Sequence, residues 1–235
     1  MASSVSSSDP LTAVPGILYP TAAFATVAVL LHRHIQSHAA FPIAPVLIKF
    51  NSRFYAAISL WFFLTILVSR MTSSQSVGIR YVNWLLPTET SRRYAYHLSK
   101  FYEYLDIFLV LANGGQVGLH FAFHHLTTPI LTYVRVLQHY EGWEIFAALN
   151  ALHHALMYAY FAGVSAFRPL LRWTGMLQLV IGILVEIRII CARLAVGGIV
   201  WPNIVAGVLL VCYMVLFIRD MMIEDGGKKK KAKDP

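Results

Sequence analysis

Long apolar stretches separated by short polar segments dominate the hydropathy pattern of the chain. Five of these stretches are long enough to cross a bilayer as helices, because the hydrocarbon core is spanned by about 20 apolar residues. They lie near residues 13–31, 54–69, 143–163, 173–191 and 199–218. Two further stretches, near 101–112 and 117–136, are shorter or contain polar residues. The pattern therefore predicts an all-α integral membrane protein with seven transmembrane helices.

The composition agrees with a membrane protein that forms one domain. Of the 235 residues, 57% are hydrophobic and only 13% are charged, whereas about a quarter of the residues in a soluble domain are charged. We expect one polytopic membrane domain over residues 1–235, with a flexible N-terminus at 1–12 and a basic cytosolic tail at 219–235. The first ten residues contain no Lys or Arg, so a signal peptide is not expected. Cys191 and Cys212 lie in apolar runs and are predicted to be buried structural thiols.

The net charge of +8 arises partly from the C-terminal sequence "GGKKKKAKDP", which holds five of the 19 Lys and Arg residues. A basic run next to a final span is typical of a cytosolic tail that faces lipid headgroups. This placement argues against a nucleic-acid-binding segment. Lys and Arg are also more frequent in the predicted loops on the side of the tail, which favours a cytosolic C-terminus. Lys231 and Lys233 resemble a dilysine retrieval signal of the endoplasmic reticulum, with an ordinary solvated charge run as the alternative.

Charged residues recur at a spacing of three in "SKFYEYLD", residues 99–106. On a helix, Lys100, Glu103 and Asp106 therefore form one slowly turning polar stripe. Charges inside a span are costly and usually face a cavity or a partner. The alternative is an interfacial helix start with Lys100 reaching toward the headgroups, which explains Asp106 poorly. We expect the stripe to face a functional site.

Three histidines occur in the apolar stretch "GLHFAFHHLTTP", residues 118–129. His120 and His124 are four residues apart and share a helix face, while His125 lies about 100° further round. A single histidine in such a stretch is typical of helix packing. Three within six positions favour a functional site.

A second polar face follows in "NALHHALMYAYF", which begins at Asn150. Asn150, His154 and Tyr158 are spaced by four and line one face, with Met157 beside them, whereas His153 points about 100° away. Asn and Tyr side chains next to a histidine can fix its tautomer through hydrogen bonds. The alternative is a polar cluster that only holds helices together. The two segments predict two helices that face each other across a buried histidine site.

Two kinds of chemistry fit such a site. The imidazoles, with Asp106, could bind iron or zinc. Alternatively, an imidazole could act without metal as a nucleophile or proton carrier. The spacing of the residues leaves both open.

Taken in order, these motifs resemble those of the ELO family of very-long-chain fatty acid elongases. The stripe from Lys100 to Asp106 resembles the family pattern K-x-x-E-x-x-D, and "QVGLHFAFHH" resembles Q-V-x-F-L-H-x-x-H-H. The segment from Asn150 to Tyr160 resembles N-x-x-x-H-x-x-M-Y-x-Y, and "FPIAPVLIKFNSRFYAAIS" is similar to the start of the second span of the family. The resemblance extends from about residue 41 to 217.

The resemblance implies an acyltransferase, a 3-ketoacyl-CoA synthase, in the endoplasmic reticulum membrane. It would join a long-chain acyl-CoA, polyunsaturated chains included, with malonyl-CoA to give 3-ketoacyl-CoA, CO2 and CoA. The implied fold is a seven-helix bundle in which six helices enclose a long acyl tunnel closed at one end. No cofactor and no metal are implied. The implied partners are the lipid bilayer, the two CoA substrates and the reductases and dehydratase of the elongation cycle, with no nucleic acid.

Roles carried over by position make His124 the candidate nucleophile and His154 its partner on the facing helix. The implied catalytic residues are His124, His154, His125, His120, Asp106 and Asn150. The implied substrate-binding residues are Lys100, Glu103, Tyr158, Met157 and Gln178. Gln178 is what survives of a T-x-x-Q-x-x-Q pattern in the sixth span, where Thr174 is out of register.

The sequence also departs from the family pattern at several positions. Without gaps, the first histidine of the family falls on Phe121, and this chain offers His120 instead. The final Tyr of the Asn150 motif is replaced by Phe161, and the Thr that follows the Asp is Ile107. These departures concern substrate handling more than the class of reaction.

The main alternative is a membrane di-iron desaturase or hydroxylase, because three groups of histidines loosely imitate its three histidine boxes. The groups are His34 and His38, His120 with His124 and His125, and His153 with His154. Against it, the boxes of that class lie on the cytosolic side of the membrane, whereas the last two groups lie inside apolar spans. A seven-helix receptor or transporter with histidine proton relays would leave the charged stripe and the Asn150 face without a common purpose.

Overall fold

The computed structural model describes residues 14–73 and 88–231, with side chains described for residues 15–71 and 88–223. Within these ranges the chain is helical and contains no strand. The helices are α1 (Val14–Ser37), α2 (Ala44–Ser73), α4 (Glu89–Tyr102), α5 (Tyr104–Ala112), α6 (Leu119–Thr132), α7 (Trp143–Phe161), α8 (Arg168–Ala195) and α9 (Trp201–Lys231). A π-helical segment, η1 (Tyr133–Gln138), continues α6, and a short 3-10 turn, η2 (Ser165–Phe167), precedes α8. The predicted all-α class is confirmed.

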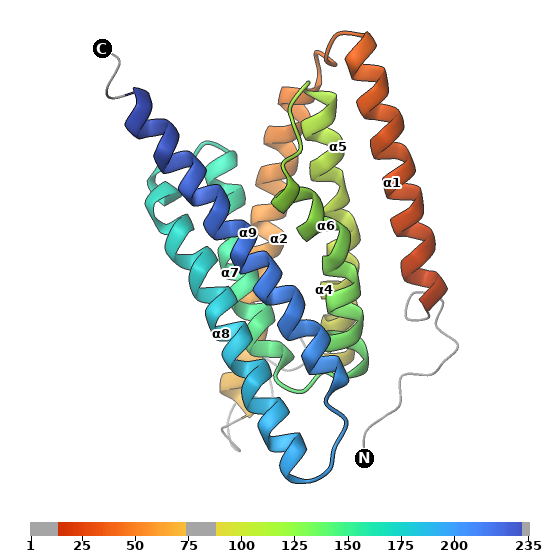
Figure 1. Cartoon of the computed structure of the whole chain (residues 1–235), viewed down its shortest axis with the longest axis vertical. Helices are drawn as coiled ribbons and strands as arrows, with labels where there is room; N and C mark the ends of the chain where they lie inside the picture. Colours follow the sequence, from red (N-terminus) through yellow and green to blue (C-terminus); the bar gives the residue numbers. More distant parts are fainter. Residues whose placement is uncertain (1–13, 74–87, 232–235) are drawn as a thin grey trace.

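The described helices form seven consecutive rods, because only Glu103 separates α4 from α5 and η1 directly follows α6. The side-chain oxygen of Thr88 caps α4 by accepting from the Ser91 backbone N–H at 3.2 Å. At the other end of this rod, Gly114 takes a φ of 74°, which lets the chain leave α5 as glycine commonly does after a helix. Figure 1 shows the long rods running side by side, with α9 inclined across them and α1 standing at one edge.

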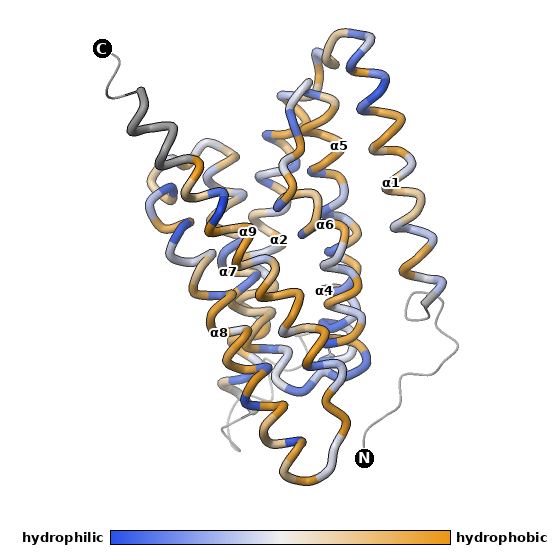
Figure 2. The backbone as a smooth tube through the Cα atoms, viewed as in Figure 1, coloured by the Kyte–Doolittle hydropathy of each residue, from blue (hydrophilic) through white to orange (hydrophobic). Residues whose placement is uncertain are grey.

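Four of the described helices are long and apolar enough to cross a membrane. They are Pro15–Ser37, Ala44–Met71, Ser165–Ala195 and Trp201–Ile223. Figure 2 shows hydrophobic residues along most of α2, α8 and α9, whereas α4 carries many hydrophilic ones. The membrane character is therefore confirmed, and the number of seven transmembrane helices stays a prediction.

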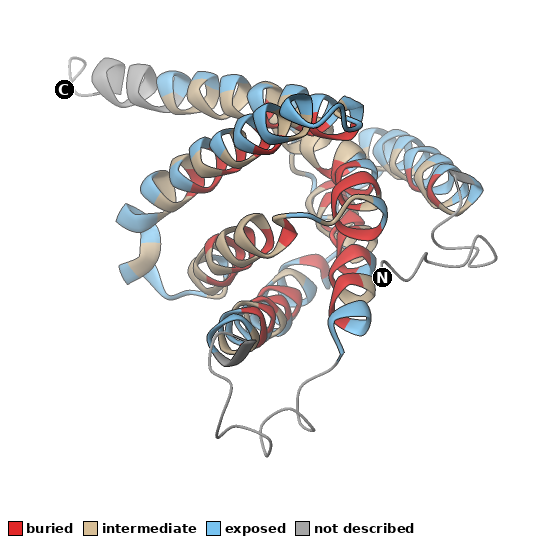
Figure 3. Cartoon of the chain, turned by 90° about the horizontal axis from the view of Figure 1, so that it is seen from below, coloured by how far each residue is buried: buried red, intermediate tan, exposed pale blue. Residues whose placement is uncertain are grey.

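Six of the rods form a closed ring, and α1 lies outside it. Going round the ring, α2 packs against α7, α7 against α8, α8 against α9 and α9 against α6. The ring closes where α6 packs against α4 and α5 packs against α2, while α1 contacts mainly α5. The view along the bundle in Figure 3 shows buried residues on the inward sides of these helices. The ring places the charged stripe of α4 and α5 opposite the polar face of α7.

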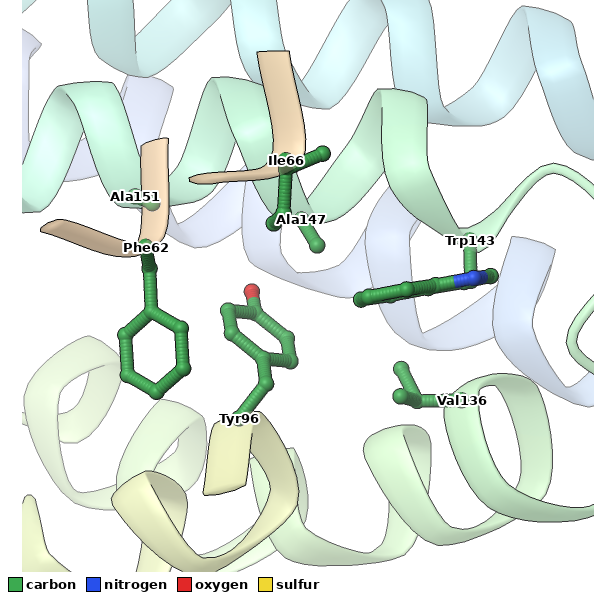
Figure 4. Packing of buried hydrophobic residues seen from close by; sticks show 7 residues of the cluster. All are labelled: Phe62, Ile66, Tyr96, Val136, Trp143, Ala147 and Ala151. Carbon is green, nitrogen blue, oxygen red and sulfur yellow. The ribbon is translucent and has the colours of Figure 1, made fainter. Parts of the chain in front are cut away.

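Two apolar clusters hold the ring together, and a third attaches α1 to it. One joins α2, α4, η1 and α7 through Phe62, Ile66, Tyr96, Val136, Trp143, Ala147 and Ala151 (Figure 4). In it the Tyr96 ring lies between Phe62 and Trp143, and the small residue Ala147 lets α2 and α7 approach closely. A second cluster joins α6, α8 and α9 through Leu131, Leu179, Ala206, Leu210 and Tyr213. A third joins α1 to α5 through Phe24, Tyr104, Ile107 and Leu111.

Two sequence-based expectations about the outer parts of the chain come out differently. The prediction of two buried thiols is wrong, because Cys191 is exposed on α8 and Cys212 is only partly buried on α9. Helix faces that meet lipid are as apolar as the interior, so hydropathy does not distinguish them. Helix α9 continues to Lys231, past the predicted start of the tail at residue 219. Residues 1–12 and Lys233 lie outside the described residues, and the side chain of Lys231 is not described.

Candidate active site

Glu103, at the break between α4 and α5, is the centre of a buried polar cluster. The residue is 1% exposed. Its Oε1 accepts hydrogen bonds from Lys100 Nζ at 2.6 Å and from the Tyr55 hydroxyl at 2.7 Å. The Nδ1 of His154 lies 3.3 Å from the same oxygen. A buried carboxylate needs partners of this kind, because its desolvation otherwise costs several kcal/mol.

Asn150 of α7 forms a second centre beside the first. Its Oδ1 accepts from the Tyr96 hydroxyl at 2.7 Å and from Lys100 Nζ at 2.9 Å. Its Nδ2 donates to Oε1 of Gln178 at 3.1 Å. Lys100 therefore joins Glu103 to Asn150, and the cluster ties α4 to α7 and α8. Lys100 is 3% exposed, so it does not reach toward headgroups as the interfacial interpretation of the stripe required.

His125 is fixed in one orientation by the backbone at the helix break. Its Nδ1 lies 2.7 Å from the carbonyl oxygen of Glu103. Because a carbonyl only accepts, Nδ1 carries the proton, and Nε2 of the neutral ring is then an acceptor. His125 is buried and supports the cluster from α6.

His124 faces the internal cavity of the ring. The cavity is also lined by Lys100, Asn150 and Gln178, and its wall is completed by Thr128, Leu131, Thr132, Phe146, Leu179 and Tyr213. It offers ≈ 20 Å³ of space to water, which is room for about one water molecule. The centroid of the His124 ring lies 6.4 Å from that of His154. The two histidines predicted to face each other from α6 and α7 therefore do so.

The far end of the charged stripe is held by α2 and α7. Asp106 accepts a hydrogen bond from the Tyr158 hydroxyl through Oδ2 and from Asn51 Nδ2 at 2.8 Å through Oδ1. Asn51 in turn accepts from the Tyr102 hydroxyl at 2.6 Å. The structure thus places Lys100, Glu103 and Asp106 near Asn150, His154 and Tyr158 in two adjacent hydrogen-bonded groups. These groups meet where the Tyr158 ring packs against the rings of Tyr55 and His154.

Sequence reasoning missed four members of this site, namely Asn51, Tyr55, Tyr96 and Tyr102. Asn51 and Tyr55 are four residues apart on α2, and Tyr96 is four residues before Lys100. A polar face at a spacing of four was therefore present in both segments. A spacing of four marks one face of a single helix and does not say which other helix that face meets.

His120 does not join the network around Glu103. Its Nδ1 lies 3.4 Å from Oδ2 of Asp220 on α9, and its ring packs edge-on against Phe217. Phe121, where the family pattern places a histidine, packs edge-on against the ring of His125 with centroids 4.5 Å apart. The one-residue shift therefore turns the imidazole from the inside of the cluster toward α9.

The other two residues singled out on α7 lie beside the network. His153 points toward α8, where its Nδ1 lies 2.8 Å from the Thr174 hydroxyl. The expected direction of His153, away from the Asn150 face, is thus found. Met157 is half-buried.

The three histidine groups of the di-iron alternative do not converge on one place, because the first lies apart from the other two. Within residues 14–73 and 88–223, no three His, Cys, Asp or Glu side chains are grouped closely enough to hold a metal ion. His34 and His38 stack on each other at the exposed end of α1, with ring centroids 4.2 Å apart. The described residues therefore do not form a site from three histidine boxes.

Comparison with known proteins adds a family and a relative. The sequence pattern of the ELO group, described as the GNS1/SUR4 family, matches residues 10–231. Over 96 residues the chain is 31% identical to a protein of Trypanosoma cruzi (strain CL Brener) named Fatty acid elongase 2. This match covers 37% of the chain and 34% of the relative, so the chain spans about a third of the length of that curated relative. No solved structure matches the chain.

Proposed function

The chain belongs to the GNS1/SUR4 family of ELO proteins, and on that premise we propose that it catalyses the condensing step of fatty acid elongation. The family and the name of the relative support fatty acid elongation in general. The proposed reaction joins a long-chain acyl-CoA, polyunsaturated chains included, with malonyl-CoA to give 3-ketoacyl-CoA, CO2 and CoA. The observation that carries the proposal is the cavity that His124 shares with Lys100 and Asn150, next to the His154–Glu103 pair.

In the first half of the reaction, a ring nitrogen of His124 attacks the carbonyl carbon of the acyl thioester. The C–S bond breaks, the acyl group stays on the imidazole, and CoA leaves as a thiol after it takes up the imidazole proton. An acyl-imidazole hydrolyses readily in water. The narrow cavity around His124 protects it, because closed sites exclude water from reactive intermediates.

In the second half, malonyl-CoA loses CO2 and its remaining electron pair attacks the acyl carbon. Negative charge builds on the thioester oxygen of the enolate, and donors placed in advance stabilise it. His154 is placed for this role, because Glu103 lies 3.3 Å from its Nδ1 and fixes the orientation of the ring. Lys100, held by Glu103 and Asn150, supplies positive charge at the wall of the cavity.

The acyl chain is proposed to lie inside the ring, between α6, α7, α8 and α9. A second small cavity shares Leu131 and Phe146 with the first and extends to the buried ion pair of Arg135 and Glu186. The two cavities support a tunnel that starts at His124 and is closed at this ion pair. Because each has room for about one water molecule, the helices of the ring must separate to admit a chain.

The cellular setting is part of the same proposal. We place the protein in the endoplasmic reticulum membrane with its C-terminus in the cytosol, held there by Lys231 and Lys233. It would work with the reductases and the dehydratase of the elongation cycle, which consume its product. It needs no cofactor and no metal in this proposal.

The test is a reconstitution with purified protein, acyl-CoA and malonyl-CoA, in which 3-ketoacyl-CoA is measured by mass spectrometry. Wild type should form the product, and His124→Ala should abolish it. His153→Ala is the matched control, because it removes a neighbouring buried imidazole that faces α8. A histidine peptide carrying the acyl mass, found only with His124 intact and malonyl-CoA withheld, would support the covalent step. Stoichiometric iron, with activity lost on chelation, would instead favour the di-iron desaturase or hydroxylase.

A further inference from the structure

His120 lies between His124, which lines the internal cavity, and Asp220 at the surface of the bundle. The Asp220 side chain on α9 is 44% exposed, that of His120 on α6 is 20% exposed, and His124 lines the cavity one helical turn further along α6. The His120 Nδ1 lies 3.4 Å from Asp220 Oδ2, and the rings of His120 and His124 have centroids 6.3 Å apart. Three titratable groups thus follow one another from the surface to the proposed nucleophile.

The spacing suits proton transfer through one bridging water. A centroid separation of 6.3 Å is too long for a direct hydrogen bond between the two rings, and a single water commonly bridges such a gap. The charged groups acting on His120 are Asp220 and Arg219 of α9. Arg219 pairs with Asp220 at 3.0 Å, and the other α9 contact of His120 is the apolar Phe217 ring. His124 is the titratable neighbour on its own helix.

The proposed reaction takes up one proton in each turnover. Acylation of His124 releases none, because the imidazole proton ends on the sulfur of CoA. In the second half, the electron pair freed by loss of CO2 forms the new C–C bond, and the C–N bond to His124 breaks with its electrons going to nitrogen. The imidazole would leave as an anion unless the nitrogen without the acyl group is protonated first. That proton has to reach a buried ring.

We propose that His120 is the general acid that protonates acylated His124 through a bridging water, and that Asp220 passes a replacement proton to His120 from outside the bundle. The inference rests on the proposed function and adds a residue to it. Nδ1 of His120 faces Asp220, which leaves Nε2 of the same ring for the exchange with His124. The pair at the surface therefore does more than fasten α6 to α9.

The experiment separates the two half-reactions in the full chain reconstituted in lipid nanodiscs. Release of free CoA after mixing with acyl-CoA reports acylation. Formation of 3-ketoacyl-CoA after malonyl-CoA is added to the acylated protein reports the second half. His120→Gln should slow the second half by about 10²-fold, at the low end of general acid catalysis, and leave CoA release unchanged within about twofold. Wild type should show a solvent deuterium isotope effect in the second half, and free imidazole should restore part of the rate of the variant.

Asp220→Asn is the second variant, because it keeps both rings and tests proton supply alone. It should slow the second half by a smaller factor with CoA release unchanged. His153→Gln, which removes an imidazole that faces α8, should slow neither half. Equal slowing of both halves, a change in KM alone, or no rescue by imidazole would show that the pair only fastens helices and would overturn the proposal. Absence of product from wild type would instead refute the proposed function.

Discussion

The buried ion pair of Arg135 and Glu186 gives the sharpest test of what holds the helices together. Nε of Arg135, in the π-helical segment η1, donates to both carboxylate oxygens of Glu186 on α8 at 2.8 and 3.0 Å. The two side chains are 5% and 9% exposed. Asn203 of α9 donates to Glu186 Oε2 at 2.6 Å. Three consecutive parts of the ring therefore meet at one carboxylate.

The loss in free energy of unfolding that is expected when the Glu186 carboxylate is removed follows from these contacts. Glu186→Leu leaves the guanidinium of Arg135 without its counter-charge, which costs about 3–5 kcal/mol of the free energy of unfolding. The double variant Arg135→Leu with Glu186→Leu removes both charges. Apart from the Asn203 hydrogen bond, which both variants lose, it loses only the hydrogen bonds that Arg135 donates to the carbonyl oxygens of His139 and Glu141, each about 1 kcal/mol. The double variant should therefore be more stable than Glu186→Leu alone by about 2 kcal/mol.

The free energy of unfolding can be measured in mixed micelles of a mild detergent with increasing SDS, followed by tryptophan fluorescence. All variants are compared at equal protein and detergent concentration. The coupling energy then comes from the double-mutant cycle. A loss below about 1 kcal/mol for Glu186→Leu, or a double variant no more stable than it, would refute the reasoning that an unpaired buried charge dominates the cost.

Two further predictions follow from packing and from the tail. Gly175→Ala should lower the unfolding free energy by about 1–3 kcal/mol, because the new Cβ would lie 2.8 Å from the Phe217 ring and 3.3 Å from that of His153; adding Phe217→Leu should recover part of the loss in the same unfolding assay. Lys231→Ser with Lys233→Ser should let the protein leave the endoplasmic reticulum, as microscopy of a tagged chain would show, and an unchanged location would reject the retrieval signal.

The fold could be predicted from the sequence where the apolar runs are long. The runs near 173–191 and 199–218 correspond to α8 and α9, because a lipid-facing helix is apolar over nearly its whole length. The second helix was predicted from residue 54 and in fact begins at Ala44. Its first turns carry Lys49 and Asn51, which hydropathy assigns to a loop, although Asn51 is buried and bonds to Asp106. Polar residues that face a site inside a membrane bundle thus lower the hydropathy of the helix that carries them, so hydropathy does not detect that part of the helix.

The site could be predicted one helix at a time. The spacing of three placed Lys100, Glu103 and Asp106 on one stripe, and the spacing of four placed Asn150 and His154 on one face, as the structure has them. Periodicity describes a single helix, so it does not say which rods of the ring meet. The hydroxyl groups of Tyr55 on α2 and Tyr96 on α4 donate to Glu103 and Asn150. These partners could not be predicted, because no pattern within the two segments indicates which residues of other helices they meet.

The shifted histidine shows what a one-residue change means on a helix. Position 121 faces His125 and the inside of the cluster, as the Phe121 ring does, whereas position 120 lies about 100° away and faces Asp220 on α9. His124 lies one turn beyond His120 and close to His125, so its ring has a neighbour on each of these two faces of α6. Moving the histidine from position 121 to position 120 therefore keeps an imidazole next to His124 but changes the residues on the far side of that imidazole. A ring at 121 would have only the buried cluster behind it, whereas the ring at 120 has a half-exposed carboxylate. In the proposed reaction, in which His124 takes up a proton in every turnover, this direction favours supply of the proton from outside the bundle.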